Sequence, residues 1–287
     1  SFNIAWDATD DLVIRGAIAK VMSRPDYSDL GAQQRITFVS DEWADDRAAF
    51  NEQPGFSGGG GNKNLKPFES VQADLSIEYY YGEGSAVGLA LFHKKVDNFV
   101  VPLVIDVEQN FAGKNNIVDA GTINIAPYST VGNGTDAVSK GAEVFIQHAF
   151  DSGFGFYANY TYNKTNKADV TINGEEFGQS ALIGSAKYQY NTSVYYEGGY
   201  FNVRASYNKR GETVLGLNSG LNVYQDPYEQ IDVNASVNLY DGLSLNAAVI
   251  NLTKSESVTR LGNDTDARLL NTSYSGRRFY AGFNYSF

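Results

Sequence analysis

The chain has 287 residues, of which 14% are aromatic and none is cysteine, and this excludes disulfide scaffolds, Cys-based zinc sites and thiol nucleophiles. A formal net charge of -11 argues against a nucleic-acid partner, because binding to phosphate backbones relies on clustered Lys and Arg. No stretch has the ~18 consecutive apolar residues of a membrane-spanning helix, so a helical membrane protein is excluded too.

Apolar and polar residues alternate with period two in segments of roughly ten residues, which is the length that a tilted strand needs to cross hydrocarbon. In one such segment Ile231, Val233 and Ala235 alternate with Asp232 and Asn234, so one face is apolar and the other polar. The pattern predicts about eleven strands, with bounds 1–7, 12–23, 69–81, 85–99, 140–150, 154–166, 186–197, 200–210, 228–240, 243–254 and 277–287.

The connections between these strands alternate in length. The turns near residues 10, 82–84, 151–153, 198–199 and 241–242 are tight, whereas segments 24–68, 100–139, 167–185, 211–227 and 255–276 are long. This alternation is typical of outer-membrane barrels, which have short periplasmic turns and long extracellular loops. The glycine run from Gly58 to Gly61 is expected to be flexible loop.

A soluble β-sandwich also alternates apolar and polar residues, and it stays open as an alternative. Two features favour a membrane barrel. Aromatic residues such as Tyr79, Tyr81, Tyr160 and Tyr162 gather at the ends of the apolar faces, where interfacial girdles lie. The opposite faces carry mid-strand polar residues that suit a hydrated lumen, namely Asp74, Glu78, Arg204, Asp232 and Asn234. We therefore predict an all-β, antiparallel transmembrane β-barrel.

Several segments resemble TonB-dependent outer-membrane receptors, in the order in which that family carries them. The C-terminal residues 277–287 resemble the closing strand, whose aromatic residues the barrel-assembly machinery reads; here these are Phe283, Tyr285 and Phe287. Further matches are Ser23-Arg24-Pro25 with Ser28-Asp29-Leu30, Gly61 to Pro67 followed by Leu75 to Tyr79, and Val249-Ile250-Asn251-Leu252-Thr253. Residues 182–187, with Tyr190-Asn191 and Tyr195-Tyr196-Glu197, look like the subgroup linked to oligosaccharide uptake in Gram-negative bacteria.

The resemblance implies that residues 1–287 are the C-terminal half of a roughly 22-stranded barrel. The plug domain, the TonB box and the remaining strands are absent from this chain, so another chain or a missing segment is expected to supply them. An odd number of strands puts the two termini on opposite membrane faces. If Phe287 lies at the periplasmic rim, Ser1 is therefore expected near the extracellular rim.

The function implied is TonB-driven import of a scarce nutrient across the outer membrane, either an oligosaccharide or, alternatively, a ferric siderophore. The partners implied are outer-membrane lipid, the TonB complex, the barrel-assembly machinery and a small-molecule or oligosaccharide ligand; no cofactor is implied. A complete passive porin, an outer-membrane barrel enzyme and a secreted binding module remain as alternatives.

Catalytic and metal chemistry find little support in the sequence. His93 and His148 fall in separate predicted strands, and a catalytic His needs a positioned nucleophile and an orienting acid within hydrogen-bond reach, so no enzyme is expected. The acidic clusters at 41–46 and 263–266 lack EF-hand spacing and are expected to be solvated loop charge. Ligand recognition is expected in the long connections, where aromatic rings can stack on a sugar while polar neighbours bond its hydroxyls. The candidate contacts are Trp43, Phe50, Phe56, Tyr128, Tyr224 and Tyr274.

Overall fold

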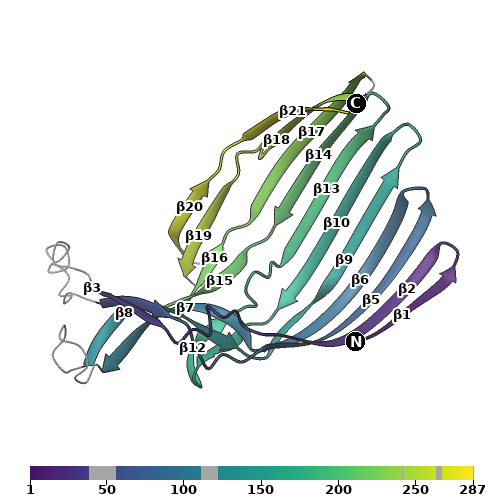
Figure 1. Cartoon of the computed structure of the whole chain (residues 1–287). Helices are drawn as coiled ribbons and strands as arrows, with labels where there is room; N and C mark the ends of the chain where they lie inside the picture. Colours follow the sequence, from purple (N-terminus) through teal and green to yellow (C-terminus); the bar gives the residue numbers. More distant parts are fainter. Residues whose placement is uncertain (39–55, 111–121, 241, 263–266, 287) are drawn as a thin grey trace.

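Eleven antiparallel strands form one continuous curved sheet in the computed structural model, and we call this sheet the wall (Figure 1). The structure describes residues 1–38, 56–110, 122–240, 242–262 and 267–286. The wall strands, in spatial order, are β1 (Phe2–Thr9), β2 (Leu12–Ser23), β5 (Phe68–Gly82), β6 (Ser85–Asp97), β9 (Ala137–Ala149), β10 (Phe154–Thr165), β13 (Tyr188–Glu197), β14 (Phe201–Arg210), β17 (Tyr228–Tyr240), β18 (Leu243–Ile250) and β21 (Arg278–Tyr285). No helix in these ranges has the length and apolar character needed to cross a membrane.

The eleven wall strands confirm the eleven predicted strands within a few residues at each end. They are joined by tight turns at one end of the wall, the turn end, and by long connections at the other, the loop end (Figure 1). Phe2 pairs with Ile18, far from the turn that joins β1 to β2, whereas Tyr285 pairs with Leu243 beside a tight turn. The two ends of the chain therefore lie at opposite ends of the wall, as an odd number of strands requires.

The long connections were predicted as loops, and this prediction is wrong for much of their length. Their described parts contain ten further strands: β3 (Gln34–Phe38), β4 (Phe56–Gly60), β7 (Phe99–Asn110), β8 (Thr122–Gly134), β11 (Ala168–Ile172), β12 (Glu175–Ser180), β15 (Thr213–Asn218), β16 (Leu221–Gln225), β19 (Glu256–Gly262) and β20 (Arg268–Tyr274). Eight of them form a second sheet in the order β12-β11-β8-β7-β15-β16-β19-β20, and β4 joins β3 to β8. We call these ten strands the loop sheet.

The buried apolar core lies in the loop sheet and at its junction with the wall. Phe99, Val101, Leu103, Val170 and Leu217 are all at most 4% exposed and pack in one cluster with Val96, Ala137 and Ala168. Because strands with apolar residues on both faces lack simple alternation, the period-two search overlooks them. The hydrophobic effect therefore holds the long connections against the end of the wall.

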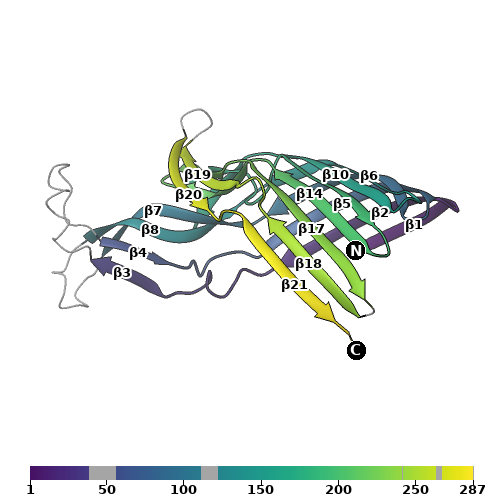
Figure 2. The ribbon, with the colours of Figure 1, turned by 90° about the horizontal axis from the view of Figure 1, so that it is seen from above.

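The glycine run predicted as flexible loop is instead part of β4, and this is a second correction. β4 pairs antiparallel with β3 and parallel with β8, and Figure 2 shows these strands together beyond the ends of the wall strands. A Cβ atom at Gly58 would lie 2.7 Å from the Arg35 carbonyl oxygen and 3.2 Å from the Tyr128 ring. Glycine is needed here because the neighbouring strand and the Tyr128 ring come so close. A run of glycines in the sequence suggests a flexible loop and does not show this close approach.

Candidate passage wall and ligand pocket

The wall has one apolar face and one polar face, and the apolar one is the more exposed. In β5, Leu75 and Ile77 are 53% and 41% exposed, while Asp74, Ser76 and Glu78 between them are half-buried. Side chains spread apart on the convex side of a curved sheet and crowd together on the concave side. The apolar face is therefore the outward face and the polar face is the inward face. A soluble protein has the opposite arrangement.

The outward face contradicts the soluble-sandwich alternative. Phe156, Val203 and Val233 are half-buried and Phe283 is 72% exposed, so none of them is enclosed in an interior. Cross-strand pairing makes the apolar surface continuous: Ile77 stands opposite Leu89, and Leu89 opposite Val144. In water this surface would be a large exposed apolar patch, whereas in a membrane it contacts acyl chains that are apolar as well.

Aromatic rings border this apolar band at both ends. At the turn end Tyr81 stacks on His148 at 5.7 Å between ring centroids, and Phe154 packs on Tyr196 at 4.8 Å. At the loop end Tyr190 contacts three rings, those of Tyr160, Tyr188 and Tyr207, at 5.8 to 6.3 Å. These two rows are the interfacial girdles that the sequence predicts.

The inward face carries ion pairs and hydrogen-bonded polar ladders. Glu78 faces Arg15 at 3.5 Å and accepts a hydrogen bond from the Tyr80 hydroxyl at 2.7 Å. Asn191 Nδ2 donates to Asn159 Oδ1 at 2.8 Å, and Gln230 Nε2 donates to Asp232 at 2.7 Å. This surface is suited to line a hydrated or plugged passage, as predicted from Asp74, Glu78, Arg204, Asp232 and Asn234.

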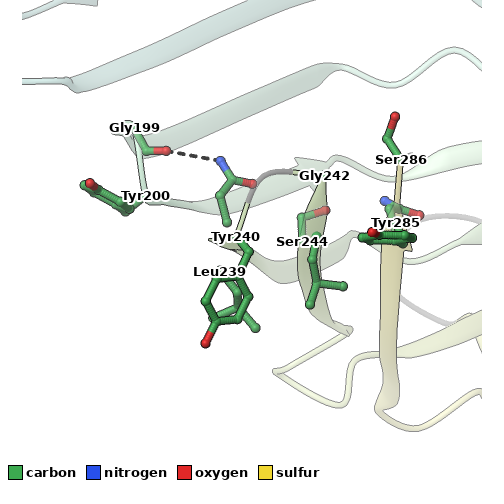
Figure 3. Close-up of a pocket in the computed structure, with 11 residues that line it drawn as sticks. Gly199, Tyr200, Leu239, Tyr240, Gly242, Ser244, Tyr285 and Ser286 are labelled. Carbon is green, nitrogen blue, oxygen red and sulfur yellow. Dashed lines mark hydrogen bonds between the residues drawn. The ribbon is translucent and has the colours of Figure 1, made fainter.

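A cavity of about 820 Å³ lies at the turn end, between the turns and the last residues of β21 (Figure 3). Tyr200, Tyr240 and Tyr285 line it and are 81%, 79% and 62% exposed. Asn238 Nδ2 donates to the Gly199 carbonyl oxygen at 3.2 Å and ties two of the turns together. Of the predicted barrel-assembly signal, Phe283 and Tyr285 lie on the outward face, and Phe287 is outside the described residues.

A pocket of about 710 Å³ opens in the loop sheet where β3, β4 and β8 meet, and we call it the loop-sheet pocket. Its lining combines Tyr27, which is 90% exposed, with Arg35, Asp29 and the glycines of β4. Within the described residues the Arg35 guanidinium makes no ion pair, so it is available to an anionic ligand. Arg35 is not among the ligand contacts predicted from the sequence, because those are all aromatic residues. Its position in the same long connection as Tyr27 is the sequence signal that points to it.

The structure brings only some of the predicted ligand contacts together. Phe56 and Tyr128 lie on neighbouring strands beside the loop-sheet pocket, but Tyr128 is only 5% exposed and covers Gly58 and Gly60. Tyr274 is 58% exposed on β20, away from both. Trp43, Phe50 and both acidic clusters lie outside the described residues.

Tyr224, the remaining predicted contact, lines a different pocket of about 500 Å³. This pocket lies between the end of β10, residues 181–187 and the β15–β16 hairpin, and it includes Tyr162 and Lys164. These two residues belong to the outward row of β10, whereas Asn163 and Thr165, which also line the pocket, belong to its inward row, so the lining comes from both faces of the strand. We call it the rim pocket.

Neither histidine is placed for shared chemistry. His148 packs in the turn-end girdle, where its Nδ1 lies 3.1 Å from the Ser85 hydroxyl, and that hydroxyl also accepts the Ala149 N–H. His93 lies towards the loop end, opposite Lys140. No cluster of three metal-ligating side chains occurs within the described ranges.

The family model described as "TonB dependent receptor-like, beta-barrel" matches residues 1–252. Among curated proteins, the chain is similar to the "Iron-regulated outer membrane virulence protein" of Vibrio cholerae, at 26% identity over 80% of the chain. The match covers 33% of that protein, so the chain spans about a third of the length of this relative.

Solved structures show the same fold. The ferric enterobactin receptor PfeA from Pseudomonas aeruginosa matches with a TM-score of 0.65 and 20% identity, over 99% of this chain and 39% of that one. The siderophore receptor PirA from Acinetobacter baumannii matches with a TM-score of 0.62 and 18% identity, over 99% and 40%. At these identities the likeness concerns the architecture of the wall and the loop sheet.

Proposed function

Because the chain belongs to the TonB-dependent receptor-like β-barrel family, we propose that the complete protein is an outer-membrane receptor that imports a ferric siderophore. Residues 1–287 supply part of the barrel wall and its loop sheet. The remaining strands, a plug and the segment that contacts TonB come from the rest of the receptor. The two unpaired edge strands, β1 and β21, support this division, because a membrane-spanning sheet must satisfy its edges.

The names of the relatives support a siderophore over an oligosaccharide. The Vibrio protein is named as iron-regulated, one solved structure is named as a ferric enterobactin receptor, and the other is named as a siderophore receptor. The oligosaccharide prediction came from residues 182–187 and the tyrosines of β13. In the structure Leu182 and Ile183 pack on the loop-sheet core, and Tyr190 packs in the loop-end girdle. Packing accounts for these residues without a sugar.

The observation that carries the proposal is the loop-sheet pocket, where Arg35 makes no ion pair with any described residue. A ferric siderophore that carries negative charge would meet a cation there, with the Tyr27 ring beside it. Arg is well suited to such ligands because its guanidinium donates several hydrogen bonds in a fixed fork.

Uptake of radioactive iron tests the proposal. Cells that lack other siderophore receptors, expressing the full-length protein under iron limitation, should take up ferric siderophore in a TonB-dependent way. Arg35→Gln should raise the half-saturating siderophore concentration about tenfold, in line with the loss of one charged hydrogen-bonding partner. Arg24→Gln is the control, because Arg24 is exposed in the same connection but does not line the pocket. TonB-dependent uptake of a labelled oligosaccharide with no uptake of iron would overturn the proposal.

A further inference from the structure

β20 is an outer strand of the loop sheet, and most of its surface is uncovered. It pairs with β19 and with no other described strand. All seven of its residues are exposed, and Leu269, Leu270 and Tyr274 are 65%, 48% and 58% exposed. Within the described residues, both faces of β20 are therefore uncovered and one of its edges is unpaired.

The side chains of β20 do not protect this edge against pairing. Natural edge strands are commonly protected by charged residues or proline. β12, the outer strand at the other end of the loop sheet, carries Glu175 and Glu176. β20 has neither a charged residue nor proline from Leu269 to Tyr274. The edge of β12 is thus suited to remain in water, whereas the edge of β20 is suited to accept another strand.

The unpaired edge of β20 continues the unpaired edge of β21. β21 pairs with β18 and β20 with β19, which is the next strand after β18, so both unpaired edges face away from these two strands. Residues 275–277 join β20 to β21 at the loop end (Figure 1). Hydrogen bonds hold this link to the end of β18: Arg277 Nε donates to the Leu252 carbonyl oxygen at 2.8 Å, and Asn251 Nδ2 donates to that of Gly276 at 3.2 Å.

A strand that pairs with β21 is in position to reach β20 as well. β21 runs from the loop end to the turn end, so an antiparallel partner runs towards the loop end, and its continuation passes alongside β20. The relatives contain enough further chain for such a partner, because this chain covers 33% of the Vibrio protein and 39% of PfeA. The partner of β20 is therefore expected in the rest of the same receptor.

We propose that β20 is the edge at which the rest of the receptor adds to the loop sheet. The occupant is an extended segment that follows the strand paired with β21, lies antiparallel to β20 and places apolar side chains on Leu269 and Leu270. Main-chain hydrogen bonds and apolar contacts hold it, as in other cases of strand addition. The wall and the loop sheet then close along one seam. This inference rests on the division of the receptor proposed above but not on the identity of its ligand.

Amide hydrogen exchange in the full-length receptor tests the docking edge. In a strand paired on one side only, about half of the backbone N–H groups have no partner. If a segment pairs with β20, the fast-exchanging half of Arg268–Tyr274 should exchange at least about tenfold more slowly than that of Glu175–Ser180 in β12. This comparison needs no variant. Equal fast fractions in the two strands would overturn the proposal.

A pair of double variants tests whether the two leucines are in the contact. Leu269→Glu/Leu270→Glu should return the exchange of β20 to the rate of β12, because charge disfavours pairing at an edge. Leu215→Glu/Leu221→Glu is the matched control: both leucines are exposed, at 38% and 37%, but lie on strands that are paired on both sides. This control should leave the exchange of β20 unchanged, and heat-modifiable migration shows that each variant is folded.

Two further outcomes would overturn the proposal. One is unchanged protection of β20 in the Leu269/Leu270 variant. The other is protection that disappears on dilution to monomer, which would assign the edge to a second copy of the receptor. Iron uptake is measured separately: protection of β20 without uptake of ferric siderophore would overturn the proposed ligand and leave the docking edge in place.

Discussion

Asn251 is a single residue that joins three parts of the chain: its own turn up to Ser255, strand β17 and the segment before β21. It is 1% exposed; its backbone N–H donates to Asp232 at 2.9 Å, and its amide group bonds Ser255 and the Gly276 carbonyl oxygen. Its φ of 58° lies in the left-handed region, which Asn tolerates better than most residues. This gives a physical reason for the Asn-Leu pair by which the sequence resembles the receptor family.

Replacement of Asn251 by Ala should lower the free energy of unfolding of the full-length receptor by about 3 kcal/mol. Buried partners on Ser255 and Gly276 lose their hydrogen bonds, and Ala at positive φ adds strain. The measurement is the urea midpoint in detergent, followed by heat-modifiable migration. Asn246→Ala serves as the matched control, because Asn246 is exposed on β18, the strand that Asn251 directly follows. Equal midpoints for the two variants would contradict this role.

Buried asparagines also hold the long connections where the sequence shows only loop-like composition. Asn133 is 7% exposed, accepts the Lys66 N–H at 2.9 Å and donates to the Lys66 and Asn98 carbonyl oxygens. Asn62 donates to the Val131 carbonyl oxygen at 3.2 Å. Composition marks these residues as turn formers, but only the folded chain shows that they connect segments some seventy residues apart.

At the scale of the element, the two faces of a wall strand should respond in opposite ways to charge. In β18, Ala247 lies on the outward face opposite Ala235 and Ala281, while Asn246 faces inward opposite Ser236. Ala247→Arg should cost about 2–4 kcal/mol because it puts a charge near the middle of the bilayer. Asn246→Arg should cost less than about 1 kcal/mol. Refolding into lipid vesicles with a denaturant titration measures both, and a reversed order would mean that the faces are assigned the wrong way round.

The contact between β4 and β8 depends on a backbone approach that only glycine allows. Gly58→Val would bring a side chain against the Arg35 carbonyl oxygen and the Tyr128 ring, so β3 and β4 should detach from β8. The expected signature is faster amide hydrogen exchange in Gln34–Phe38 and Phe56–Gly60 of the full-length receptor. Gly282→Val is the control, because a Cβ there meets no atom within 4 Å. Unchanged exchange in both segments would show that the packing adapts.

At the scale of the whole molecule, the wall has two edges that pair with no described strand. β1 and β21 are the ends of the wall, and neither pairs with the other. Unpaired backbone groups at membrane depth are costly, so a chain of residues 1–287 alone should not give a stable barrel. It should aggregate, be digested by protease and lack heat-modifiable migration. Addition of the rest of the receptor should prevent aggregation, protect against protease and give heat-modifiable migration. A protease-resistant barrel of residues 1–287 alone would contradict the division proposed above.

The sequence by itself determined the wall: its eleven strands, their two faces, the girdles and the opposite placement of the termini. Each strand has lipid on one side and water on the other, so apolar and polar residues alternate along every strand and can be recognised in each strand by itself. Only the tertiary structure decided the loop sheet and the close approach at Gly58. These features depend on which distant segments pair and in what register. The interactions between two paired segments produce no periodic pattern in the sequence of either one, so the sequence does not show which segments pair.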